Sequence, residues 1–181
     1  MRTLIKMIVV VALLPCGAPS QTQTPYTGQE KRHIKALSPD EIEAYQSGQG
    51  MGFAKAAELN QFPGPKHVLE LAAQLTLTEG QRAETQGVFD HMHAAATRIG
   101  NLIVEKERKL DLLFASKTID ASRLRRATAE IAGLQGKLRA IHLQAHLEMR
   151  RVLSLAQIKK YDELRGYDSG NTDYKDHQHK H

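Results

Sequence analysis

The chain has 181 residues, enough for one domain of ordinary size, and a net charge of +5. Hydrophobic residues make up 41% of it, but aromatic residues only 5%, and tryptophan is absent, which favours aliphatic side chains packed between helices. No run of like charge is long enough for a nucleic-acid-binding arm, and no aromatic residues alternate with the basic ones, so we expect no nucleic acid among the partners.

The first 20 residues have the pattern of an export signal. A basic start precedes an apolar run at residues 7–14, and small residues at 18–20 suit cleavage by a signal peptidase. The run is far shorter than the ~20 residues of a membrane-spanning helix. We therefore predict export with cleavage after residue 20. A lipid anchor on Cys16 is the less favoured alternative, because Pro15 stands where a lipoprotein signal has a small residue.

Three further regions follow the signal. Residues 21–37 are polar and without periodicity, which predicts a disordered lead. Residues 38–166 predict one helical domain, which opens with Ser38 as a helix cap and continues through short helices at about 39–47, 53–59 and 66–75. Residues 167–181 predict a disordered tail whose alternating histidines would bind divalent metals only weakly.

Two long amphipathic helices dominate the predicted domain. Apolar residues recur in steps of three and four over residues 79–114 and again over 120–152, with a short turn between the two segments. So short a turn makes the helices antiparallel neighbours that bury their apolar stripes against each other. A final helix follows to residue 165, and no strand pattern of useful length occurs. We therefore predict an all-α fold built on a long antiparallel hairpin.

Two similar segments bracket this hairpin. Each has a leucine, then a hydroxyl residue, then a glutamine three residues after the hydroxyl. The hydroxyl can cap the first turn of a helix while the glutamine reaches back to the cap's own N–H group, an arrangement known as a capping box. The residues are Leu77, Thr78 and Gln81 in the first segment and Leu153, Ser154 and Gln157 in the second.

These segments resemble the LTxxQ signature of the Spy/CpxP family, in which the motif occurs twice around a long helical hairpin. The first copy matches fully, the second has Ser154 in place of threonine, and the resemblance covers about residues 66–165. It implies a cradle-like homodimer in the periplasm. Spy-like members are ATP-independent chaperones, CpxP-like members damp envelope-stress signalling, and ZraP- and CnrX-type relatives bind zinc, nickel, cobalt or copper.

The leading prediction is a periplasmic chaperone that binds unfolded or misfolded clients and requires no cofactor, with an inner-membrane sensor protein as a further partner. The alternative is a metal-binding or metal-sensing protein. Enzymatic activity is not expected, because the sequence offers no nucleophile with a positioned base, no phosphate loop and no dinucleotide fingerprint.

A set of histidines and methionines has the residue types of a metal site. Two histidines four apart and a methionine three further on share one face of the second long helix, while a histidine, a glutamate and a methionine lie in or before the short helices. Imidazole with thioether favours copper or nickel, and a carboxylate admits zinc or cobalt. The other reading is ordinary interfacial histidines. The candidate ligands are Met51, His67, Glu70, His142, His146 and Met149.

The second long helix is also rich in basic residues. A basic face beside apolar side chains suits a chaperone, because long-range attraction finds clients that apolar contacts then hold. A merely solvated helix face is the alternative. The candidate client-binding residues are Arg123, Arg126, Lys137, Arg139 and Arg150.

Overall fold

A computed structural model describes residues 24–167, and in these residues helices are joined by turns and loops, with no strand. A short 3-10 helix, η1, spans Gln29–Lys31. The α-helices are α1 (Pro39–Gln46), α2 (Lys55–Glu58), α3 (Pro65–Glu70), α4 (Glu79–Ala115), α5 (Ala121–Val152) and α6 (Leu155–Arg165). The predicted fold class is confirmed, whereas dimerisation stays a prediction. The predicted export signal and most of the predicted tail lie outside the described residues.

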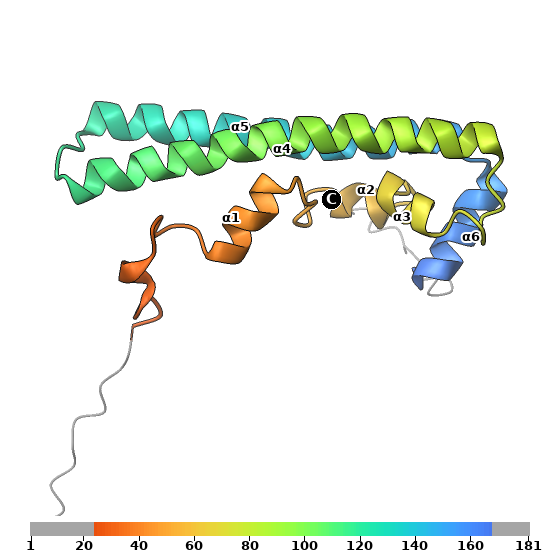
Figure 1. Cartoon of the computed structure of the whole chain (residues 1–181), viewed down its shortest axis with the longest axis horizontal. Coiled ribbons are helices and arrows are strands. Elements are labelled where there is room, and N and C mark those ends of the chain that lie inside the picture. The colour runs from red at the N-terminus through yellow and green to blue at the C-terminus, as the bar shows by residue number, and fades with distance from the viewer. Residues whose placement is uncertain (1–23, 168–181) are drawn as a thin grey trace, which may run out of the picture.

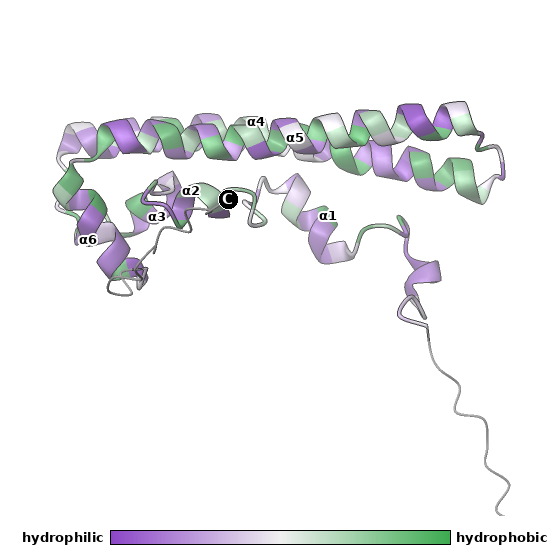
Figure 2. Ribbon diagram, turned by 180° about the vertical axis from the view of Figure 1, so that it is seen from behind, coloured by the Kyte–Doolittle hydropathy of each residue, from purple (hydrophilic) through white to green (hydrophobic). Residues whose placement is uncertain are grey.

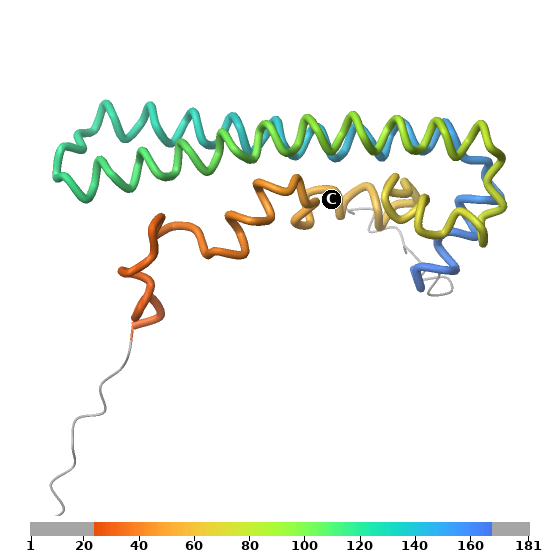
Figure 3. The backbone as a smooth tube through the Cα atoms, in the orientation of Figure 1, coloured from red at the N-terminus to blue at the C-terminus, as the bar shows by residue number. Residues whose placement is uncertain are grey.

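The long hairpin of α4 and α5 is the frame of the molecule. The two helices run antiparallel, and α1, α2 and α3 lie along one side of them, while α6 turns back toward that side at the end opposite the hairpin turn (Figure 1, and the backbone tube in Figure 3). Thr78 caps α4 and Asp120 caps α5 through their side-chain oxygens. Within residues 24–167 no helix is long and apolar enough to span a membrane.

Two separate apolar clusters hold the short helices against the hairpin. The first cluster lies under α1 and consists of Ile34, Leu37, Tyr45, Ala96, Ile99, Ile103, Val104 and Leu138. The second lies where α3 and α6 meet the hairpin and consists of Val68, Leu75, Met149, Leu153, Ile158 and Tyr161. Along α5, the two clusters are separated by the turns that carry His142 and His146.

Helix α1 approaches α4 at a glycine. A Cβ atom on Gly100 would lie 1.9 Å from the carbonyl oxygen of Tyr45, so only glycine allows this contact between the backbones. The close approach fixes the end of α1 and the position of the segment that follows it.

The packed domain begins earlier than the sequence predicts. Ile34 and Leu37 are buried in the first cluster, and Asp111 of α4 accepts hydrogen bonds from both the backbone N–H and the Nζ atom of Lys35. The prediction of a disordered lead over residues 21–37 is therefore wrong for this part of the lead. Two aliphatic side chains in a polar stretch are too few to produce a periodic sequence pattern. They are nevertheless enough to pack this segment against the hairpin.

The two capping boxes are both formed, and they are joined to each other. Gln81 and Gln157 exchange hydrogen bonds through their side-chain amides, at 2.9 Å and 3.0 Å. Gln81 also donates to the carbonyl of Val152, and Gln157 donates to the carbonyl of Leu75. The start of α4 is thus tied directly to the start of α6.

The apolar stripes of the hairpin are not covered over their full length. Leu112, Phe114 and Leu124, near the turn, are 59%, 53% and 39% exposed, because none of the described short helices reaches over them. Figure 2 shows apolar and polar residues interspersed along both long helices up to this end.

Candidate metal-binding pocket

A cavity of about 550 Å³ lies between the two apolar clusters. Its walls come from the segment after α1, the start of α3 and the middle parts of α4 and α5. The described residues that line it include four histidines and two methionines but no carboxylate; these six are Met51, His67, Met92, His93, His142 and His146. We refer to this cavity as the histidine pocket.

His142 contributes a buried nitrogen without a partner. The side chain is only 4% exposed, its ring stacks on Phe53, and its Nε2 atom has no hydrogen-bond partner among the described residues. Burial lowers the pKa of the His142 imidazole, and the neighbouring His146 lowers it further. A buried polar atom without a partner is costly. A neutral imidazole nitrogen of this kind can ligate a metal ion.

His146 is held in a defined orientation one helical turn away. Its Nδ1 atom lies 2.6 Å from the carbonyl oxygen of Phe62. Because a carbonyl only accepts, Nδ1 must carry the hydrogen, and in the neutral ring Nε2 then keeps its lone pair. A hydrogen bond of this kind on the second ring nitrogen is typical of histidines that ligate metals.

Gly64 leaves space beside the Nε2 atom of His146. A Cβ atom on Gly64 would lie 3.0 Å from Cε1 and 3.1 Å from Nε2 of His146. The backbone of Gly64 has φ −86° and ψ 140°, which any residue can adopt. Glycine is therefore needed here only for the space it leaves in the pocket wall.

Glu58 of α2 ties this wall to α6. Its side chain is 13% exposed, and its Oε2 atom accepts a hydrogen bond from the backbone N–H of Gly64 and lies 3.7 Å from Nδ1 of His146. Its Oε1 atom accepts hydrogen bonds from the hydroxyls of Tyr161 and Tyr167. The carboxylate does not line the pocket, but it fixes the loop whose carbonyl orients His146.

The methionine in the pocket wall is not the one that the sequence indicates. Met149 is fully buried in the second apolar cluster and does not line the pocket. Met92 of α4, which the sequence places in the apolar stripe, lines it instead. A methionine in an amphipathic stripe gives no sequence signal that separates a core residue from a ligand, so only the fold reveals Met92.

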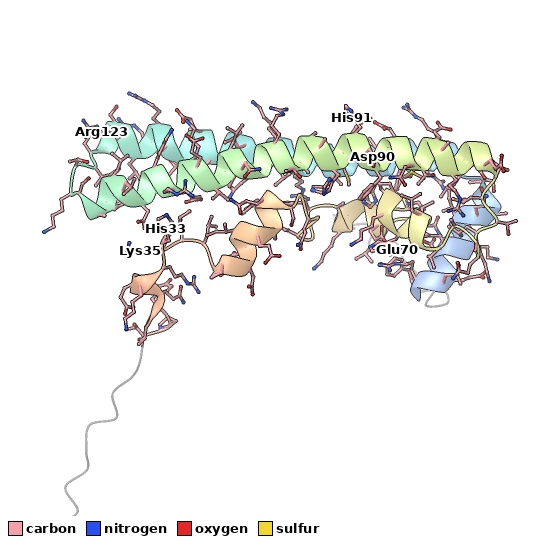
Figure 4. The ribbon with its side chains drawn as sticks, viewed as in Figure 1. His33, Lys35, Glu70, Asp90, His91 and Arg123 are labelled. Carbon is pink, nitrogen blue, oxygen red and sulfur yellow. The ribbon has the colours of Figure 1, made fainter. Side chains whose placement is uncertain are left out.

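The remaining candidate ligands divide into two groups. Met51 and His67 line the pocket, whereas Glu70 does not. Nδ1 of His67 lies 2.9 Å from a carboxylate oxygen of Glu70, and this hydrogen bond lowers the pKa of Glu70. Figure 4 shows Glu70 on α3 and His91 on the opposite side of the hairpin, facing away from the short helices.

Within residues 24–167 no group of three or more histidine, cysteine, aspartate or glutamate side chains is close enough to hold a metal ion. The pocket instead combines two buried imidazoles with methionine thioethers. Its residues fit a metal through the partnerless Nε2 atom of His142 and the space that Gly64 leaves beside His146.

The predicted client-binding residues do not form one site. Arg123 lies by the hairpin turn (Figure 4), where it donates a hydrogen bond to the carbonyl of Thr118. Arg150, near the other end of α5, lies over the ring of Phe62 at 5.5 Å from its centroid. Arg126, Lys137 and Arg139 are exposed along the helix between these two.

Comparison with known proteins points to metals. A family model described as heavy-metal resistance matches residues 3–160, most of the chain. No curated protein and no solved structure gave a significant match.

Proposed function

We propose that this chain, which belongs to the heavy-metal resistance family, binds a heavy-metal ion in the histidine pocket. The ion is the cargo of the protein and comes from the group copper, nickel, cobalt and zinc, for all of which imidazole is a suitable ligand. We also propose that the protein works in the periplasm, on the basis of the export-signal pattern in its first 20 residues.

The partnerless Nε2 atom of His142 is the observation on which this proposal rests. In a histidine that serves only packing, a buried ring nitrogen is normally satisfied by a carbonyl, a hydroxyl or water. His146, four residues away, has its orientation fixed through Nδ1, and both imidazoles line the same cavity. The lowered pKa of His142 keeps its ring unprotonated, which metal binding requires.

Calorimetric titration of the full chain with copper, nickel, cobalt and zinc tests the proposal. The tail histidines His177, His179 and His181 are first replaced by asparagine, so that weak binding at the tail does not contribute. One equivalent of metal should bind, and His142→Leu and His146→Ala should each abolish this binding. His142→Leu keeps an apolar side chain against Phe53 and limits any loss of packing.

His91→Ala is the matched control, because His91 is an exposed histidine on the other side of the same hairpin. It should leave the titration unchanged. Metal at 100 times its Kd should also raise the free energy of unfolding by ~2.7 kcal/mol. Unchanged binding in both pocket variants, or no binding at all after the tail is altered, would disprove the proposal.

A second candidate function is the binding of unfolded protein, as in Spy-like chaperones. The observation that favours it is the exposed apolar side chains of Leu112, Phe114 and Leu124 near the hairpin turn, the end of the hairpin that also carries the basic Arg123 and Arg126. Apolar contact with a basic rim suits client segments that expose both apolar and acidic groups.

An aggregation assay separates the two functions. If the turn end binds clients, near-stoichiometric protein suppresses light scattering of a heat-stressed client without ATP, and Phe114→Ser with Leu112→Ser removes the suppression. The pocket variant His142→Leu should leave it intact. Suppression that is lost equally in all variants would point to instability of the variants rather than to a client surface.

A further inference from the structure

The methionine thioethers in the wall of the histidine pocket indicate which metal ion the pocket binds. The pocket places Met51 and Met92 around the same cavity as His142 and His146. We infer that the pocket selects a soft monovalent ion, Cu(I), with Ag(I) as its chemical equivalent, over the divalent ions. This inference rests on the proposed function, because it specifies the ion that the pocket binds.

Donor softness is the first argument. Thioether sulfur is a soft ligand that selects Cu(I), whereas divalent nickel, cobalt and zinc are served as well or better by imidazole, carboxylate and water. The two methionines and two imidazoles that line this cavity are neutral donor types, and thioether is the type that a soft ion prefers.

Charge is the second argument, and it is independent of the first. Among the described residues that line the pocket there is no aspartate or glutamate, and Lys66 adds a positive charge to the rim. Burying an ion without a compensating charge is costly, and the cost rises steeply with the charge of the ion. The nearest carboxylates, Glu58 and Glu70, lie outside the lining, behind His146 and His67, and offset only part of this cost. Neutral ligands and a nearby lysine therefore penalise a divalent ion more than a monovalent one.

The backbone at Met51 is the third argument. Met51 lies between two glycines and has φ +44°, in the left-handed region where glycine is the favoured residue. A methionine there costs backbone free energy that a glycine would avoid. Met51 is 39% exposed and lines the pocket, so it is the more accessible of the two methionines there, since Met92 is buried.

Competition with the Cu(I) chelator bicinchoninate, under anaerobic conditions and with the tail histidines replaced, measures the Cu(I) affinity of the full chain. Met92→Leu and Met51→Gly should each weaken Cu(I) binding by at least ~10-fold, the lower end of what even outer-shell changes cost. Nickel and zinc affinities should change less than twofold. Met51→Gly removes the strain of a positive φ at this position, and urea unfolding of both variants checks that a loss of affinity does not reflect unfolding.

Met149→Leu is the matched control, because Met149 is a buried methionine of the adjacent cluster that does not line the pocket. Its Cu(I) affinity should equal that of the parent chain. NMR spectra of the chain with carbon-13-labelled methionine methyl groups give a second readout. One equivalent of Ag(I) should shift the methyl resonances of Met51 and Met92 and leave the chemical shift of Met149 nearly unchanged. This readout is independent of stability.

Different results would contradict the selection of Cu(I) and the binding of metal itself. If His142→Leu abolishes metal binding but the Met51 and Met92 variants keep full Cu(I) affinity, the pocket binds metal and the inference about Cu(I) is wrong. The same holds if zinc or nickel binds more tightly than Cu(I). If no metal binds to the chain with the altered tail, the proposed function fails as well.

Discussion

The paired glutamines Gln81 and Gln157 allow the sharpest test of the fold. Each side chain makes four hydrogen bonds: one from the N–H of its own helix cap, one to a carbonyl of another segment and two with the other glutamine. At ~1 kcal/mol per bond, replacing either glutamine by alanine removes ~4 kcal/mol at most, and since both are only half-buried, water recovers part of this loss. We expect each single variant to lose ~2–4 kcal/mol.

The coupling between the two glutamines is the more specific quantity. Two of the bonds are shared, so the double variant Gln81→Ala/Gln157→Ala should be less destabilised than the sum of the single variants by ~2 kcal/mol. Urea unfolding followed by circular dichroism gives all four free energies. Gln86→Ala, an exposed glutamine of the same helix that bonds only to Asp90, should change stability by less than ~0.5 kcal/mol.

Additive effects of the two glutamine substitutions would refute this reasoning. Distant, independent sites add within ~0.5 kcal/mol. Coupling inside that limit would mean that each capping box serves only its own helix and that the amide pair contributes nothing to the joint between α4 and α6.

Three further predictions concern single residues. Gly64→Ala should lower metal affinity in calorimetry with little change in the urea midpoint, because its methyl group enters the space beside His146 while the backbone stays relaxed. Burial lowers the pKa of His142 in the folded chain below its unfolded value of ~6.5. The unfolded chain then takes up a proton first, so the free energy of unfolding is highest above pH ~6.5 and falls as the pH drops toward the folded pKa. His142→Leu should flatten this pH dependence of the free energy of unfolding between pH 7.5 and 5.5, measured by urea titration. Gly100→Ala should lower the urea midpoint markedly, because its methyl group collides with the carbonyl of Tyr45 and undocks α1; an unchanged midpoint would contradict the close contact.

The elements of the fold could be predicted from the sequence because their signals are local. The caps at Ser38, Thr78 and Ser154 and the three-and-four spacing of apolar residues lie within a few turns of the helices that they start or bury. The turn between α4 and α5 is too short for any arrangement but an antiparallel hairpin. Each of these inferences needs only nearby residues, and the structure agrees with each.

The contacts between the elements could not be predicted in this way. The exchange between Gln81 and Gln157 joins residues 76 positions apart, and each glutamine already had a complete local role in its own capping box. For the same reason the sequence indicates Met149 as a ligand, since it follows His146 by three on one helix face. The packing of α3 and α6 instead places Met149 in a core, and Met92 of another helix lines the pocket.

Glu58 connects the histidine pocket to α6, and one substitution tests whether that connection affects both stability and metal binding. In Glu58→Gln one acceptor oxygen becomes an amide donor, so the N–H of Gly64 and the hydroxyls of Tyr161 and Tyr167 can no longer all be satisfied. Losing one hydrogen bond to a charged group costs ~1.5–3 kcal/mol of stability. Because the same carboxylate fixes the loop whose carbonyl orients His146, metal affinity should also fall, by ~10–100-fold.

The matched control for Glu58→Gln is Glu163→Gln, an exposed glutamate of α6 that pairs only with Lys160. It should leave both stability and metal affinity nearly unchanged, since surface ion pairs contribute ~0–1 kcal/mol. A Glu58→Gln variant that is destabilised yet binds metal as tightly as the parent chain would show that Glu58 only joins helices. A joint loss of stability and affinity would show that the one carboxylate serves both roles, holding α6 through the two tyrosines and fixing the loop that orients His146.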